Sequence, residues 1–297
     1  MNALSPRDVA LASCMIFLWG SNYAVAKLGL GQIPPFLFLS TRFALTAILL
    51  APFIKWRIPP LQGIGVYAVI VGLAHFGTLF YALRHTDAAT VIILSQVSVP
   101  LITILGAFLL GEKLRARHML GIVIATSGLA VVAGSPGFAG GLGIVACILV
   151  SATAWAVGTV WMKAQVNLPS SEINFWLAAL SAPMLYALSV LAGERPLEIL
   201  PEISPLSALT IFYQAFFTVI VGYGIWNFLV RKYEVNLVAP LTMLVPFTGI
   251  LVAFLVLGES LSTPKIVGGC ITMLGVVTIL APSSWAFRVF GERRKVS

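Results

Sequence analysis

The fold is decided by residues 118–162, which read HMLGIVIATSGLAVVAGSPGFAGGLGIVACILVSATAWAVGTVWM. These 45 residues contain no Asp, Glu, Lys or Arg. A helix needs about 20 apolar residues to cross a bilayer, so the stretch is long enough for two crossings. Turn-forming residues, GSPGFAGG at 134–141, divide it near the middle. The sequence therefore predicts two membrane-spanning helices joined by a short loop.

Apolar runs of similar length fill the rest of the chain. Seven of them carry no charged residue, and an eighth is interrupted only by Arg42. Their positions are 9–26, 58–83, 88–111, 173–193, 203–230, 235–258 and 266–287, with the interrupted run near 35–54. Together with the pair in 118–162, they predict ten transmembrane helices.

The composition points to the same class of protein. Of the 297 residues, 59% are hydrophobic and only 9% are charged, whereas soluble domains carry about 25% charged residues. The mean hydropathy is +1.01. We therefore predict an all-α integral membrane bundle with the lipid bilayer as its surroundings. The net charge is +8, and the basic residues that produce it lie in short loops between the apolar runs. We therefore do not expect nucleic acid as a partner.

The basic residues are distributed unequally between the two sides of the predicted bundle. If the N-terminus is cytoplasmic, the outer segments hold only Lys27, Arg84, Arg195 and Lys265. The inner segments then hold Arg7, Lys55, Arg57, Lys113, Arg115, Arg117, Lys163, Arg231, Lys232, Arg288, Arg293, Arg294 and Lys295. Cytoplasmic loops carry an excess of Lys and Arg, so both termini are expected to be cytoplasmic.

Two halves of the sequence resemble each other. Residues 110–114 read LGEKL and residues 257–261 read LGESL, and glycines follow each motif at the same spacing. Every pair is 147 residues apart, with Gly121 and Gly128 matching Gly268 and Gly275. Each half also opens with a tryptophan eight residues before a lysine, namely Trp19 with Lys27 and Trp155 with Lys163.

An odd number of spans in each repeat places the second copy upside down in the membrane. We predict two inverted five-helix repeats, at residues 1–134 and 140–282, followed by a basic cytoplasmic tail at 283–297. Inverted repeats of this kind build transporters whose substrate site lies at the bilayer midplane between the halves.

Several motifs resemble the EamA domain of the drug/metabolite transporter superfamily. They are WGSN at 19–22 with Lys27, Arg42 in the second span, the Gly-Glu pairs, IVGYGIW at 220–226, RKYE at 231–234 and APLTMLVP at 239–246. Within that family the chain is most similar to exporters of amino-acid metabolites such as cysteine and O-acetylserine. The resemblance covers the whole chain as two EamA domains. It implies export of small metabolites across a bacterial cytoplasmic (inner) membrane, but the superfamily also carries drugs, nucleotide sugars and polyamines.

Signatures of an enzyme or a metalloprotein are absent from the sequence. It contains neither GxxxxGK[ST] nor HExxH, and its three histidines are scattered. We therefore expect no catalytic residue, no metal and no cofactor. An intramembrane enzyme would need a nucleophile and a base at one depth, and a receptor would need no internal cavity; these two classes remain as alternatives to a transporter.

Three charged residues are candidates for gating or structural roles. Arg42 lies within a span, where a charge is expensive, so it should face the bundle interior. One interpretation is structural: Arg42 forms an ion pair or donates hydrogen bonds to backbone carbonyls. The other is functional: Arg42 forms part of a gate or contacts a carboxylate of the substrate. Glu112 and Glu259 lie at the ends of their spans. Each is interpreted either as a structural contact at a helix end or as a residue that couples transport to an ion gradient. No carboxylate lies at mid-depth, where proton-coupled pumps often place one.

Polar and aromatic side chains at mid-span are the candidate substrate-binding residues. Each has core packing as its alternative role, and His75 could instead make an interhelical hydrogen bond or accept a proton. Trp19 shares a helix face with Asn22, as Tyr223 does with Trp226. The complete set is Trp19, Asn22, His75, Gln96, Trp155, Tyr223 and Trp226.

These features together predict a secondary transporter. We expect export of amino-acid-like small metabolites by alternating access, with the chain functional as a monomer. A permease of the same fold for drugs or other metabolites is the main alternative. The scarcity of buried carboxylates favours gradient-driven facilitation, with weak proton coupling through His75 as the competing hypothesis.

Overall fold

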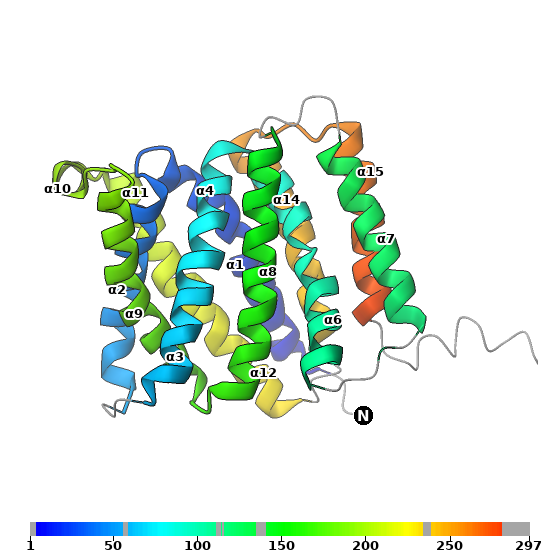
Figure 1. The fold of residues 1–297 in the computed structure, drawn as a ribbon, viewed down its shortest axis with the longest axis horizontal. Coiled ribbons are helices and arrows are strands. Elements are labelled where there is room, and N and C mark those ends of the chain that lie inside the picture. Colours follow the sequence, from blue (N-terminus) through cyan, green and yellow to red (C-terminus); the bar gives the residue numbers. More distant parts are fainter. Residues whose placement is uncertain are drawn as a thin grey trace, which may run out of the picture.

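The computed structural model describes residues 4–55, 59–110, 114, 116–134, 141–233 and 239–280. Within these residues the chain folds into helices and contains no strand. The long helices stand side by side with their axes roughly aligned, and the connections lie at the two ends of the bundle (Figure 1). In the described residues, the long helical segments lie along the predicted apolar runs.

The helices of the first half have the following bounds. They are α1 (Pro6–Leu30), α2 (Pro35–Leu50), the 3-10 turn η1 (Ala51–Phe53), α3 (Leu61–Tyr67), the π-helical η2 (Ala68–Gly77), α4 (Thr78–His85), α5 (Ala88–Ser95), α6 (Ser98–Leu110) and α7 (Ala116–Ala133). The segments α3, η2 and α4 form one continuous helix.

The second half continues through corresponding elements. They are α8 (Gly141–Gln165), α9 (Ser170–Leu191), the short α10 (Pro196–Ile199) and η3 (Leu200–Glu202), α11 (Pro205–Phe212), the π-helical η4 (Tyr213–Gly222), α12 (Tyr223–Lys232), the 3-10 segment η5 (Ala239–Leu244), α14 (Val245–Leu257) and α15 (Thr263–Leu280).

Eight helices in the described part of the chain are long and apolar enough to cross a membrane. They are Pro6–Leu30, Pro35–Phe53, Leu61–His85, Ala88–Leu109, Ala116–Ala133, Gly141–Gln165, Ser170–Leu191 and Pro205–Trp226. Two shorter apolar helices, Val245–Leu257 and Thr263–Ile279, complete the bundle. Large side chains such as Phe108, Leu142 and Leu191 project from its surface, as a lipid environment allows.

Proline and capping residues determine where several helices begin and break. Ser5 and Asp87 cap α1 and α5, because their side chains accept hydrogen bonds from the backbone N–H groups of Asp8 and Thr90. The predicted fourth span is interrupted between α5 and α6. Pro100 has no N–H to offer the carbonyl of Gln96, so the helix restarts with a short turn.

The contacts between helices occur in corresponding pairs. Helix α1 of the first half packs against η4 and α14 of the second half. Correspondingly, α8 of the second half packs against η2 and α6 of the first half. Likewise α2 contacts η4 and α9 contacts η2. The two remaining major contacts join α2 to α9 and α7 to α15. The helices α1, α2, α8 and α9 and the two π-helical segments therefore surround the centre of the bundle.

Candidate functional site

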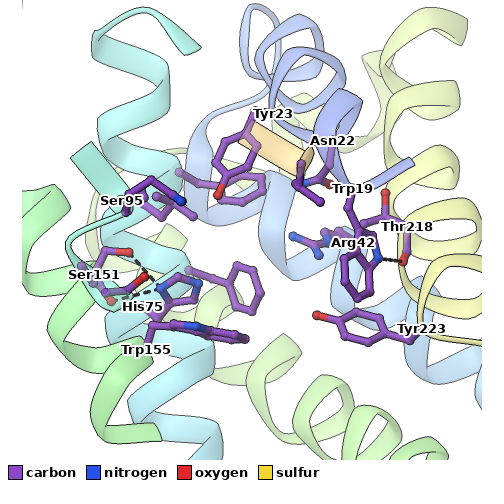
Figure 2. A pocket seen from close by; sticks show the side chains of 17 residues that line it. Trp19, Asn22, Tyr23, Arg42, His75, Ser95, Ser151, Trp155, Thr218 and Tyr223 are labelled. Atoms are coloured by element: carbon purple, nitrogen blue, oxygen red, sulfur yellow. Dashed lines mark hydrogen bonds between the residues drawn. The ribbon is translucent and has the colours of Figure 1, made fainter. Parts of the chain in front are cut away.

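A cavity of about 250 Å³ lies at the centre of the bundle, where the two halves meet. Its walls come from α1, α2, η2, α4, α5, α6, α8, η4, α12 and α14. The residues that line it are Trp19, Asn22, Tyr23, Arg42, His75, Phe76, Leu79, Phe80, Ser95, Gln96, Ser98, Ser151, Ala152, Trp155, Thr218, Tyr223 and Val245. Figure 2 shows the larger polar and aromatic side chains facing one another across this space.

One wall of the cavity is built around Trp19. Its indole Nε1 donates a hydrogen bond to the backbone oxygen of Thr218 at 3.3 Å, which joins α1 to η4. The ring centroid of Tyr223 lies 5.1 Å from that of Trp19. The indole is therefore held in place from two sides and presents an amphipathic surface to the cavity.

The opposite wall carries His75 and Trp155, whose ring centroids are 4.9 Å apart. His75 Nδ1 lies 2.9 Å from Ser151 Oγ and 3.1 Å from the backbone oxygen of Ser151. These contacts join η2 to α8. Trp19 and Trp155, which are repeat partners in the sequence, thus stand on opposite walls (Figure 2).

Arg42 supplies the positive charge of the cavity. Its side chain comes from α2 and is only 4% exposed. The guanidinium carbon lies 4.9 Å from the ring centroid of Phe76, 5.4 Å from that of Phe43 and 5.5 Å from that of Phe80. Such cation–π contacts partly compensate for the loss of hydration. Within the described residues no carboxylate pairs with Arg42, and no acidic residue lines the cavity.

Several buried polar atoms at the cavity have no hydrogen-bond partner among the residues that the structure describes. They are Arg42 Nε and Nη1, Asn22 Oδ1, Ser95 Oγ and Thr218 Oγ1. The great majority of buried polar groups in proteins are hydrogen-bonded, so a cluster of unpartnered groups around one cavity indicates a site for polar ligand groups. The cavity offers both donors and acceptors, set among aromatic rings.

Two predicted substrate-binding residues have distinct surroundings. Gln96 lines the cavity and its Nε2 lies 3.8 Å from Met273 Sδ. Trp226 is not among the lining residues, although its ring centroid lies 5.9 Å from that of Trp19. Of the two tryptophans, only Trp19 lines the cavity.

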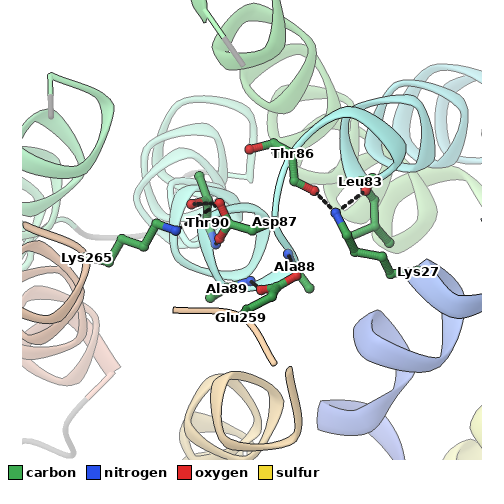
Figure 3. Close-up of polar contacts among 9 residues, drawn as sticks. All are labelled: Lys27, Leu83, Thr86, Asp87, Ala88, Ala89, Thr90, Glu259 and Lys265. Atoms are coloured by element: carbon green, nitrogen blue, oxygen red, sulfur yellow. Dashed lines mark hydrogen bonds and ion pairs between the residues drawn. The ribbon is translucent and has the colours of Figure 1, made fainter. Parts of the chain in front are cut away.

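The two glutamates of the predicted gating set lie away from the cavity. Glu112 is outside the described residues. Glu259, in the connection between α14 and α15, accepts hydrogen bonds from the backbone N–H groups of Ala88 at 2.7 Å and Ala89 at 3.0 Å (Figure 3). Its carboxylate therefore caps the first turn of α5 from a distant part of the chain.

Other charges gather at this end of the bundle around Glu259. Lys265 on α15 forms an ion pair with Asp87, with 3.0 Å between Nζ and Oδ2 (Figure 3). Burial opposes ionisation of Asp87, but hydrogen bonds from Thr90 and the contact with Lys265 outweigh it and lower the pKa of this carboxyl group. Lys27 donates to the backbone oxygens of Leu83 and Thr86, where α4 ends.

The comparison with known proteins identifies the family. Residues 8–134 and 142–281 match the EamA-like transporter family. The chain belongs to this family. It is therefore a multi-pass membrane transporter of small molecules and not an enzyme.

Curated relatives align over most of their length. The chain is 30% identical to the "Probable amino-acid metabolite efflux pump" of Escherichia coli (strain K12), over 92% of this chain and 94% of that protein. It is 27% identical to the "Uncharacterized inner membrane transporter YedA" of the same strain, over 84% and 82% of the two chains. A solved crystal structure superposes with a TM-score of 0.66 at 18% identity, covering 97% of this chain and 100% of that one, which establishes a shared fold.

The sequence offered no distinct signal for part of the cavity lining. Ser95, Ser151 and Thr218 carry short hydroxyl side chains, which in membrane helices commonly serve packing or bond to their own backbone. Tyr23 follows Asn22 directly, and a neighbouring residue on a helix points in a different direction. The one available signal was proximity in sequence, because Ser95 precedes Gln96.

Proposed function

We propose that this protein is a secondary transporter that exports amino-acid-like small metabolites through the central cavity by alternating access. The observation that carries the proposal is the cavity itself. A cavity of about 250 Å³ is large enough to admit a small solute. Its unpartnered polar groups and aromatic walls suit a molecule with both polar and apolar parts. The efflux activity named for the relative in Escherichia coli supports the same substrate class.

Alternating access follows from an architecture of ten spans in two inverted repeats, residues 1–134 and 140–282. The paired helix contacts support this part of the proposal, because exchanging the halves exchanges α1 with α8 and η4 with η2. The chain direction supports it too, since α1 starts at the lower end of the bundle and α8 at the upper end (Figure 1). The binding site then lies on the axis that relates the repeats.

Polar contacts at the two ends of the bundle provide the gates in this proposal. The outer end is closed by Lys27, by the Asp87–Lys265 pair and by Glu259. At the inner end, Lys232 Nζ and the Tyr233 hydroxyl each lie 2.7 Å from Asp8 Oδ2 and join α1 to α12. Each end must open in turn while the other end holds the halves together.

In this proposal the protein works as a monomer in the inner membrane, with both termini in the cytoplasm and the tail at 283–297 on the same side. Export follows the gradient of the metabolite, because no carboxylate that could carry a proton lines the cavity in the described part of the chain.

The test is uptake into proteoliposomes that contain the purified protein, with a panel of labelled amino acids and an imposed or collapsed pH gradient. We expect saturable, protein-dependent flux of one chemical class at a rate that the pH gradient does not change. Flux that requires the gradient and loses this requirement in His75→Gln would instead assign proton coupling to His75. Saturable flux of drugs alone would favour a permease of the same fold with another substrate class.

A further inference from the structure

Arg42 differs from Arg84 and Lys27, two basic residues at the outer end of the bundle, because two of its buried donors have no hydrogen-bond partner among the described residues. Arg84, at the end of α4, donates from Nη1 to the backbone oxygens of Leu30 at 2.8 Å and Ile33 at 2.9 Å. Lys27 likewise donates to two backbone oxygens. Neither Nε nor Nη1 of Arg42 has an acceptor, although both are buried. These two donors therefore take no part in a clamp on backbone carbonyls.

The surroundings of Arg42 define the ligand group that it can take. The guanidinium is a planar fork of donors that matches the two oxygens of a carboxylate. The three phenylalanine rings around it supply no hydrogen-bond acceptor, so they leave the donors available. A buried cation in a membrane gains from a neutralising anion, and the described cavity lining contains none.

Two hydrogen-bond acceptors line the same cavity as Arg42 and are drawn near it in Figure 2. They are Asn22 Oδ1 and Thr218 Oγ1, which have no hydrogen-bond partner among the described residues. An ammonium group supplies three donors. In an α-amino acid the ammonium and the carboxylate are attached to the same carbon, so one such molecule could engage Arg42 and its neighbours together. Its side chain would then extend toward His75 and Trp155.

We propose that Arg42 binds the carboxylate of the transported metabolite, while Asn22 and Thr218 accept hydrogen bonds from the adjacent ammonium group. The inference rests on the proposed function, since it names the substrate group recognised at the same cavity. The ligand class is a zwitterionic α-amino acid or a close derivative that retains both charged groups.

Binding measurements on the purified full-length protein test this assignment. Isothermal titration calorimetry would compare L-leucine with its methyl ester, with 3-methylbutylamine, which lacks the carboxylate, and with 4-methylpentanoate, which lacks the ammonium. L-cysteine, its methyl ester and cysteamine form a second series. The free amino acids should bind at least about 30-fold more tightly than the ester or the amine, as expected for a buried, charge-assisted contact. The loss on removing the ammonium should be smaller.

Variants assign the preference to Arg42. Arg42→Gln should weaken binding of the free amino acid by about 30-fold or more and bring its affinity close to that of the ester. Arg42→Lys should restore part of the preference, because it keeps the charge without the fork. Arg195→Gln, at an exposed position outside the cavity, is the matched control and should bind as the wild-type protein does.

Each outcome bears on the inference. Equal binding of acid and ester by the wild-type protein would overturn it, and this comparison holds even if Arg42→Gln does not fold. A folded Arg42→Gln that keeps the preference would overturn it as well. Failure of every free amino acid to bind, together with flux of carboxylate-free solutes into proteoliposomes, would refute the inference and leave the transporter proposal intact. Absence of both binding and flux would refute both.

Discussion

Glu194 and Glu259 each place a carboxylate at the start of a helix from a distant part of the chain. Glu194 accepts hydrogen bonds from the backbone N–H groups of Phe36 and Leu37 in α2, at 3.2 and 2.8 Å. Glu259 does the same for α5. The first N–H groups of a helix have no partner within the helix, and a negative charge there is further stabilised by the helix dipole.

Removal of the carboxylate of Glu259 should therefore lower stability. We expect Glu259→Ala to reduce the free energy of unfolding by about 1–2 kcal/mol, the range for loss of a helix cap. Glu259→Gln should fall between this variant and the wild-type protein, because the amide oxygen still accepts a hydrogen bond. The measurement is SDS-induced unfolding of the purified protein. Glu202→Ala, at an exposed position, is the control, and an equal loss there would contradict the capping role.

The residues that line the cavity were predictable when their chemistry was rare in an apolar helix. Trp155 and His75 were found because large polar or aromatic groups at mid-span stand out from Val, Leu and Ala. Thr218 was not found, because threonine is common in membrane helices and its exposure to a cavity depends on tertiary packing. Trp226 shows the limit of the helix-face argument, since Tyr223 lines the cavity and Trp226, three residues later on the same helix face, does not.

At the scale of elements, the contact between α7 and α15 depends on glycine. A Cβ atom on Gly128 would lie 2.5 Å from the backbone oxygen of Gly268 and 2.5 Å from the backbone N of Thr272. A Cβ atom on Gly275 would lie 2.6 Å from the oxygen of Gly121. Small residues permit close approach of membrane helices, where van der Waals packing replaces the hydrophobic effect as the source of association. The glycines that revealed the sequence repeat thus form this helix contact.

A single methyl group at this contact should be destabilising. Gly128→Ala requires the two backbones to separate and should cost about 1–3 kcal/mol, as overpacking of a core does. Gly65→Ala is the matched control, because no atom lies within 4 Å of the added Cβ, and it should be neutral or slightly stabilising. Both are measured by SDS-induced unfolding. Equal stability of the two variants would show that the helices do not approach as closely as described.

The helical elements themselves were largely predictable, but their internal breaks were only partly so. The apolar runs gave the order and approximate ends of the helices, because length and hydropathy are local properties. The break between α5 and α6 lies just before Pro100, whose effect on the preceding turn is a local property of the sequence. The π-helical segments η2 and η4 were not predicted, because hydropathy and run length do not distinguish a π-helical turn from an α-helical one.

At the scale of the whole molecule, the proposed orientation has a direct consequence for labelling. In a background without Cys14, Cys147 and Cys270, Glu198→Cys should react with a membrane-impermeant maleimide in intact cells. Lys55→Cys should react only after permeabilisation, because it lies at the opposite, cytoplasmic end. Both positions are exposed in the structure, so accessibility within the protein is matched. The reverse labelling pattern would contradict the proposed orientation and place both termini outside the cytoplasm.

If the substrate passes through the cavity between the two halves, a side chain that fills this cavity should stop transport. Ser95 lines this space, so Ser95→Trp should fill it, whereas Thr153→Trp adds the same side chain at an exposed position on α8. The measurement is amino-acid flux in proteoliposomes that contain equal amounts of each folded protein. We expect the wild-type protein and Thr153→Trp to transport at similar rates and Ser95→Trp to lose at least about 90% of the flux. Undiminished flux in Ser95→Trp would contradict a route through the cavity.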